Sequence, residues 1–174
     1  MTNSHECLYE FKDSAEFIAF TDWDDVLISP KSGSFVSQLQ RIAKLNPFTA
    51  SFSITRLDSH LPTAFTKTNK FSLERAVNEA GYNRKVLDPK VVVKPERVAG
   101  VWIHKLLFPE KSKFDEVKVD DDSIVILHIH NLTYGGDNVE RGKVKTIGNL
   151  TDFINGKIME KNLRDFFKRQ KFKF

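Results

Sequence analysis

Short apolar and polar stretches alternate along the chain, and their spacing predicts both strands and helices. The apolar run at residues 16–21 is typical of a strand, and it leads directly into an acidic cluster at Asp22, Asp24 and Asp25. After a turn, Ser34 has the character of a helix N-cap. Apolar residues at helical spacing then predict a helix that ends at Asn46-Pro47.

A second half of strands and helices follows. Alternation from residue 48 to 57 predicts a strand whose apolar face comprises Phe48, Ala50, Phe52 and Ile54. Ser72 caps a short helix that closes at Gly81. Further extended segments are predicted at 90–94, 97–108, 123–132 and 143–147. A last helical region runs from Thr151 towards Arg169.

This order of elements predicts an α+β fold, because strands are grouped together instead of alternating with helices. We expect a single domain with a mainly antiparallel sheet, two or three flanking helices and a basic C-terminal helix. Within it, residues 1–15 are predicted to be a flexible N-terminal segment, 16–156 the globular core, and 157–174 a basic, aromatic helix and tail.

Composition narrows the cellular setting. The 174 residues include a single cysteine, Cys7, which rules out an internal disulfide and a zinc site built from cysteines. The N-terminal residues lack the basic start and apolar run of a signal peptide, and no apolar stretch approaches the length that spans a bilayer. We therefore predict an intracellular, cytoplasmic protein. Association with a membrane surface or with a virion is compatible with this location.

Positive charge is concentrated at the C-terminal end. Residues 141–174 hold ten Lys or Arg and three acids, whereas the other 140 residues hold 17 basic and 20 acidic side chains. Such an end favours an anionic partner, since Lys and Arg neutralise phosphates. The candidate contacts are the basic residues Lys157, Lys161, Arg164, Lys168, Arg169, Lys171 and Lys173, and the aromatic residues Phe166, Phe167, Phe172 and Phe174.

Three interpretations of this end remain open. Phe beside Lys suits a membrane surface or an assembly contact, and it also suits single-stranded nucleic acid through stacking and phosphate contacts. Alternatively, the region is an amphipathic helix that covers the core through Ile158, Leu163, Phe166 and Phe167.

The segment Phe20-Thr-Asp-Trp-Asp-Asp-Val-Leu27 resembles the first motif of haloacid-dehalogenase-like phosphatases, in which an apolar strand precedes Asp-x-Asp. The resemblance implies a Mg²⁺-dependent enzyme with Asp22 as nucleophile and Asp24 as general acid. It also implies a central parallel strand before Asp22. By the same resemblance, Thr55 would supply the hydroxyl of the second motif and Lys94 the lysine that neutralises charge. The Mg²⁺ ligands would be Asp22, Asp24, Asp120 and Asp121.

A simpler interpretation of these acids is a solvated turn with Trp23 packed inward. The histidines also allow two interpretations. His128 and His130 alternate on a predicted strand, so they lie on one face, where they form either a metal site with Asp120 or Asp122 or a polar face opposite Val125, Leu127 and Ile129.

Residues 48–170 are similar in the order of elements to rhabdovirus matrix proteins, through the segment Phe48–Leu57, the helix through Ala80 and the strand after Asp120. The resemblance implies a non-enzymatic assembly protein that associates with itself and bridges ribonucleoprotein to an anionic membrane, with no cofactor. We take this as the leading functional prediction. The phosphatase and a sequence-independent binder of single-stranded nucleic acid are the alternatives.

Overall fold

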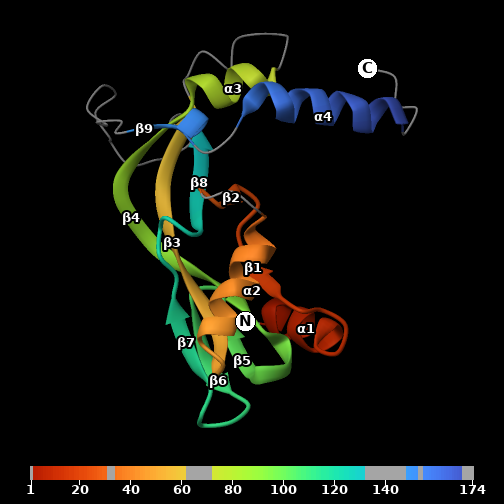
Figure 1. The fold of residues 1–174 in the computed structure, drawn as a ribbon, viewed down its shortest axis with the longest axis vertical. Coiled ribbons are helices and arrows are strands. Elements are labelled where there is room, and N and C mark those ends of the chain that lie inside the picture. Colours follow the sequence, from red (N-terminus) through yellow and green to blue (C-terminus); the bar gives the residue numbers. More distant parts are fainter. Residues whose placement is uncertain (1, 31–33, 62–71, 132–147, 153–154, 170–174) are drawn as a thin grey trace. The chain divides into compact units, whose positions relative to one another are not determined.

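The computed structural model describes residues 2–30, 34–61, 72–131, 148–152 and 155–169 (Figure 1). The helices are α1 (Thr2–Phe11), α2 (Phe35–Leu45), α3 (Leu73–Glu79) and α4 (Gly156–Arg169), with the 3-10 turns η2 (Pro95–Arg97) and η3 (Leu150–Asp152). The strands are β1 (Ile18–Phe20), β2 (Asp25–Ile28), β3 (Thr49–Leu61), β4 (Gly81–Val93), β5 (Val98–Trp102), β6 (Lys105–Pro109), β7 (Asp115–Lys118), β8 (Val125–Asn131) and β9 (Gly148–Asn149).

The sheet is mostly antiparallel, which confirms the predicted α+β class. Its strand order is β1-β4-β3-β8-β2, and β7 and β9 pair with β3 and β4 outside this path. β1 runs antiparallel to β4, with Phe20 opposite Val91, whereas β7 runs parallel to β3. β5 and β6 form a separate antiparallel hairpin. The chain divides into two compact units, one made of residues 1–57 and 86–127 and the other of 58–85 and 128–174.

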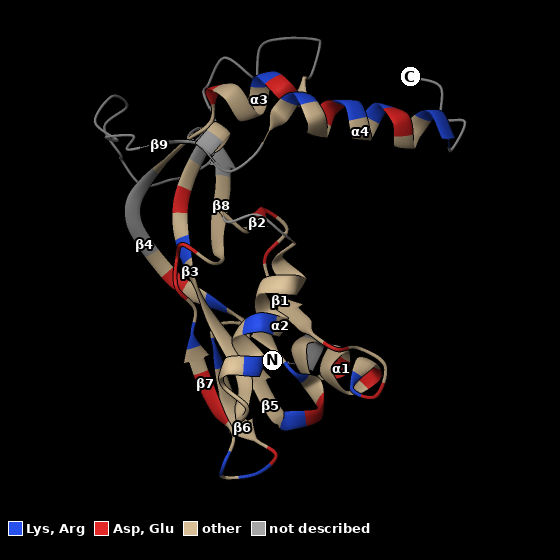
Figure 2. Ribbon diagram, viewed as in Figure 1, with Lys and Arg blue, Asp and Glu red and all other residues tan. Residues whose placement is uncertain are grey.

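In the second unit, α4 packs against α3 by its N-terminal end. A side chain at Gly156 would lie 2.9 Å from Val77 Cβ and 3.0 Å from Glu74 Cα, so only glycine permits this approach. Farther along, Glu160 accepts hydrogen bonds from Ser72 Oγ (2.7 Å) and from the backbone N–H of Glu74 (2.9 Å). Figure 2 shows that Lys and Arg are spread along α4 and interrupted by acids. The contacts of Gly156 and Glu160 fix the N-terminal part of this basic helix against α3.

Glu160 makes the α3–α4 contact sensitive to acid. The Glu74 backbone N–H, with Arg164 and Ser72, lowers the pKa of Glu160 from 4.5 to about 2. A carboxyl whose pKa is lowered on folding contributes stability above its unfolded pKa and loses it as pH falls towards the folded pKa. We expect the contact to weaken between about pH 4.5 and pH 2 in the native chain. In Glu160→Gln this pH dependence should be absent, which can be checked by following helical circular dichroism against pH; an identical acid transition in both proteins would contradict it.

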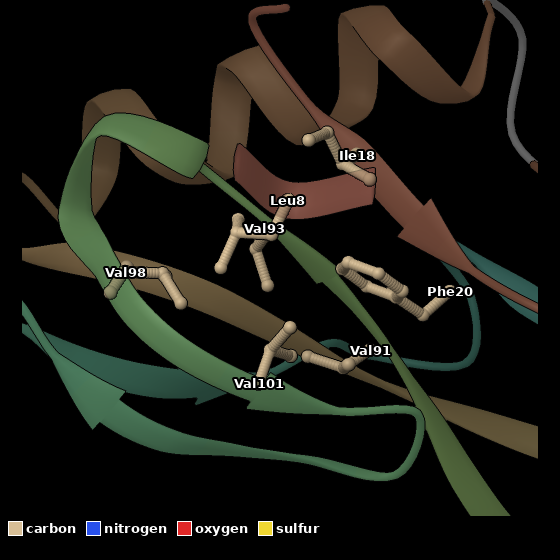
Figure 3. Close-up of a cluster of buried hydrophobic side chains, with 8 residues drawn as sticks. Leu8, Ile18, Phe20, Val91, Val93, Val98 and Val101 are labelled. Carbon is tan, nitrogen blue, oxygen red and sulfur yellow. The ribbon is translucent and has the colours of Figure 1, made fainter. Parts of the chain in front are cut away.

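The first unit has a core that two helices and the sheet build together. Figure 3 shows Leu8 of α1 directed towards side chains of β1, β4 and β5. The members of this cluster are Leu8, Ile18, Phe20, Ala50, Val91, Val93, Val98 and Val101. A second cluster comprises Leu39, Ile42, Phe52, Ile54, Val92, Val119, Ile124 and Ile126. Val92 belongs to the second cluster and its neighbours to the first, because successive side chains of a strand point to opposite faces.

Several predicted elements are confirmed. Ser34 caps α2, since its side chain accepts a hydrogen bond from the Ser37 N–H (3.2 Å), and Ser72 caps α3 in the same way through Arg75. The predicted strands at 16–21, 48–57 and 123–132 correspond to β1, β3 and β8, whereas the strand predicted at 90–94 is only the end of β4, which begins at Gly81. The predicted strand at 143–147 lies outside the described residues.

Other predictions of local structure were wrong. Phe48 is 53% exposed although Ala50, Phe52 and Ile54 are buried, because β3 begins only at Thr49. Trp23 is fully exposed instead of packed inward. The extended segment at 97–108 is the hairpin of β5 and β6, which turns between Trp102 and Lys105.

The N-terminal segment and the C-terminal helix also differ from the simplest expectations. Residues 2–11 form α1, whose Leu8 is buried, while the proposed boundaries at 15 and 156 and the flexibility of the first segment stay predictions. On α4, Ile158, Leu163 and Phe166 are 56%, 39% and 53% exposed. They share one side of the helix, but they do not cover the core.

Candidate functional site

Several ion pairs meet at the acidic turn, by which we mean Asp22–Asp25 from the end of β1 to the first residue of β2. The Asp25 backbone N–H donates to the Asp22 carbonyl oxygen (3.2 Å), and the Asp22 N–H donates to Asp25 Oδ2 (3.0 Å). The turn therefore closes on itself through its first and last residues. This holds the Asp25 carboxylate under the turn, where its side chain is fully buried.

Arg56 of β3 binds both ends of the acidic turn. Its Nη2 lies 2.8 Å from Asp22 Oδ2, and its Nε donates to Asp25 Oδ1 at 2.7 Å. The side chain is only 10% exposed. A planar guanidinium can donate to two carboxylates through separate N–H groups. Arg56 therefore sets the spacing of the two carboxylates and also compensates their negative charge.

Lys90 of β4 adds a second buried cation. Its Nζ lies 2.8 Å from Asp22 Oδ2, and its side chain is 1% exposed. The distance is that of an ion pair, although the contact does not have the angles of a hydrogen bond. Asp22 itself is 44% exposed, so it links the buried cations to the surface.

Together these residues form a site of mixed charge with a defined polarity. Two carboxylates, Asp22 and Asp25, are held from below by Arg56 and Lys90. Asp24 is exposed at the tip of the turn. Because Arg56, Lys90 and Asp25 are buried, the carboxylate oxygens that the turn offers to solvent are those of Asp22 and Asp24.

The residues that the phosphatase resemblance implied are not assembled here. Thr55 is buried in β3, and Lys94 lies 3.4 Å from Glu96 and above the ring of Phe17. The Asp120 carbonyl accepts from the N–H groups of Ser123 and Ile124 before β8. Among the described residues, Asp120 and Asp121 join no group of three possible metal ligands with Asp22 or Asp24.

Topology also contradicts the phosphatase. That fold requires the strand before the first aspartate to be central and parallel to its neighbours. Here β1 is the terminal strand of the sheet path and runs antiparallel to β4. Asp22 consequently follows an edge strand and lacks the strand arrangement that the resemblance implied.

Sequence reasoning missed Arg56 and Lys90, although each carried a signal. Arg56 follows Ile54 and Thr55 within an apolar strand pattern, and Lys90 directly precedes three valines. A charged residue in such a run is either at the surface or buried with an opposite charge.

The histidines do not form the predicted metal site with Asp120 or Asp122 within the part of the chain that is described. His128 is half-buried, and the side chain of His130 lies outside the described residues. The prediction that only alternate residues of β8 point inward was wrong, because Val125, Ile126 and Leu127 are all buried. This stretch is covered on both faces.

On the C-terminal helix, the predicted basic contacts Lys157, Lys161, Arg164, Lys168 and Arg169 are all exposed. The rings of Phe166 and Phe167 meet edge to face, with centroids 5.5 Å apart. Lys171, Phe172, Lys173 and Phe174 lie outside the described residues. None of the helices that the structure describes is long and apolar enough to cross a membrane.

Comparison with known proteins assigns the chain to a sequence family. The sequence profile of Glycosyltransferase family 92 matches residues 1–170, and the chain belongs to this family. One glycosyltransferase family 92 protein of Caenorhabditis elegans is 30% identical over 129 residues, which are 73% of this chain and 25% of that protein. A second from the same organism is 29% identical over 124 residues, or 71% of this chain and 24% of its own length.

The family corrects the functional predictions. A glycosyltransferase family contradicts the non-enzymatic matrix protein of virions, the haloacid-dehalogenase-like phosphatase and the nucleic-acid binder. The matrix resemblance rested on the order of elements, which unrelated proteins share. The chain spans about a quarter of the length of these curated relatives. The predicted cytoplasmic location and the absence of a cofactor stay predictions.

Proposed function

We propose that the chain is part of the catalytic domain of a glycosyltransferase, and that the acidic turn binds the phosphate leaving group of an activated sugar donor through a divalent cation. Membership of the family supplies the reaction class. The observation that carries the site is the pair of buried cations, Arg56 and Lys90, which hold two carboxylates of a surface turn in place.

The donor atoms of the turn fit a hard divalent cation. Carboxylate oxygens are the ligands that Mg²⁺ and Mn²⁺ prefer, and Asp24 and the exposed side of Asp22 offer them at the surface. When bound, such a cation neutralises phosphate charge and stabilises the oxygen that departs from the sugar.

The protein's own contribution is to hold Asp22 and the two ends of the acidic turn in place before the donor arrives. Arg56 sets the spacing of Asp22 and Asp25, and Lys90 keeps Asp22 from turning away from β4. A preorganised site needs less rearrangement when charge develops on the leaving group. Transfer breaks the bond from the anomeric carbon to a phosphate oxygen, which leaves with the bonding electrons, and forms a bond to the oxygen of an acceptor hydroxyl, whose proton is released to solvent.

Substitution of Asp24 by Asn tests this proposal. Calorimetric titration of the 174-residue chain with nucleoside diphosphates in Mn²⁺ should show binding that Asp24→Asn weakens about 10-fold or more, since a neutral amide is a poorer cation ligand. Asp121→Asn is the matched control, because Asp121 is an exposed aspartate in the turn before β8. Equal affinities for both variants, or no binding by the native chain, would refute the site.

The expected anionic partner of the C-terminal helix and self-association are retained as separate proposals. The first is supported by the exposed basic residues of α4. An anionic partner of α4 would bind the second unit, and its binding does not depend on the proposed sugar-donor site of the first unit.

A further inference from the structure

Helix α4 carries apolar and basic side chains on opposite sides. Its exposed apolar residues are Ile158, Met159, Leu163 and Phe166, with exposures from 38% to 56%. Four of its five basic residues, Lys157, Lys161, Arg164 and Lys168, follow one another at steps of four, three and four, whereas Arg169 lies beside the apolar residues. At about 100° per residue, each set forms a stripe, and the two stripes lie roughly opposite one another.

Within the second unit, the described residues of α4 are buried only at its N-terminal end. Gly156 is buried and Glu160 bonds to the start of α3, but from Lys161 to Arg169 none of the described side chains is fully buried. An isolated helix of fewer than about 12–15 residues is marginal in water. A further surface that covers the apolar stripe would stabilise the outer half of α4.

We propose that α4 lies on an anionic lipid surface, with its apolar stripe in the headgroup region and its basic stripe facing the polar side. Helices that lie in a membrane surface have an apolar face opposite a face rich in Lys and Arg. Anionic lipids attract the positive charge of the second face. α4 holds five Lys or Arg and two acids, and one of these acids, Glu160, is already bound to Arg164 and α3. The long Lys and Arg side chains can extend along the helix to reach phosphates.

This geometry favours lipid over the other partners of a basic helix. Nucleic acid would engage the basic stripe and leave Leu163 and Phe166 in water. A second α4 packed apolar face to apolar face would add five more cations and only two acids, so the basic stripes would stay without enough anionic partners. An anionic bilayer satisfies both stripes at once, because its headgroups attract the cations and its acyl boundary accepts the apolar side chains.

Sedimentation of the whole chain with vesicles tests the proposal. Phosphatidylcholine vesicles with phosphatidylserine should bind the chain, and those without should bind it far less. Leu163→Ser with Phe166→Ser should reduce binding at least 10-fold, since two apolar side chains leave the interface. Phe108→Ser is the matched control, because Phe108 is a 64% exposed aromatic on β6 in the first unit.

A second pair of variants isolates charge. Lys161→Glu with Lys168→Glu should weaken binding about 25-fold or more, as each basic residue near an anionic surface contributes about fivefold. Lys105→Glu with Lys111→Glu changes two exposed lysines in the first unit and should have little effect. Circular dichroism of each variant establishes that it is folded.

The possible outcomes decide between lipid and its rivals. Binding that rises with phosphatidylserine and falls with salt, and that needs both stripes, supports the proposal. Vesicle binding that survives in both α4 variants overturns it, as does binding to single-stranded RNA without binding to vesicles. No donor or cation enters this assay, so its result is independent of the proposed glycosyl transfer.

Discussion

Arg56→Met should lower the free energy of unfolding by about 3–5 kcal/mol, as expected when one partner of a buried ion pair is removed. Arg56 is 10% exposed and bonds to Asp22 and Asp25, and the Asp25 side chain has no exposure. Methionine has a similar length but offers no N–H group, so the Asp25 carboxylate stays buried without its guanidinium. Most folded domains are stable by only about 5–15 kcal/mol, which makes this a severe loss.

Denaturant titration with matched variants identifies the cause. Arg75→Met removes another arginine that binds a carboxylate, Glu79, but its side chain is 46% exposed, so the expected change is within about 1 kcal/mol. Adding Asp25→Asn to Arg56→Met should recover part of the loss, because the buried charge then disappears as well. If Arg56→Met were no less stable than Arg75→Met, the acidic turn would not depend on its buried cations.

Phe52→Ala is expected to lower the free energy of unfolding by about 3–5 kcal/mol, the usual range for a fully buried phenylalanine. Phe52 has no exposed surface, and its ring meets Phe17 edge to face with centroids 5.8 Å apart. Truncation would leave a cavity between β3 and the residues of the second cluster, such as Leu39 and Ile126.

Phe48 provides the comparison within the same segment. It is 53% exposed and lies before the start of β3, where Lys113 contacts its ring face at 5.6 Å. Phe48→Ala should therefore cost less than about 1 kcal/mol. Parallel urea titrations measure both values. Equal losses would show that the two phenylalanines are buried alike, contrary to the structure.

The pattern of apolar residues was sufficient for most elements with a strong local signal. β1, β3, β8, α2 and α3 each combine a clear period with a cap or a turn, whereas only the last residues of β4, with the valines at 91–93, were predicted. The elements that were missed lack such a signal. α1 places its apolar residues Cys7, Leu8, Tyr9 and Phe11 almost in sequence, and β2 and β7 are four residues long and begin with acids.

The candidate site was found only in part. Asp22 and Asp24 were recognised because acids directly after an apolar strand are conspicuous. The buried partners of Asp22 are distant in sequence, since Arg56 lies 34 residues away on β3 and Lys90 lies farther still on β4, and their contact with the turn is a long-range consequence of strand pairing. The pairing of Phe20 with Val91 places Lys90 near the turn, and no local pattern contains that register.

The two functional resemblances failed for the same physical reason. An apolar strand followed by Asp-x-Asp meets a general need to place carboxylates at a strand end, and the order of strands and helices is common to many folds. Neither feature determines which groups face the carboxylates. The family match over residues 1–170 depends on nearly the whole sequence. It therefore distinguished between protein families where a short motif could not.

The sequence by itself determined the α+β class, the main strands and helices, and the basic amphipathic character of the C-terminal helix. These properties depend on spacings of a few residues, which the chain displays locally. Tertiary structure alone decided that Arg56 and Lys90 are buried beneath the acidic turn and that the apolar side of α4 is exposed. Burial depends on which distant segments pack together, and only the folded chain brings those segments into contact.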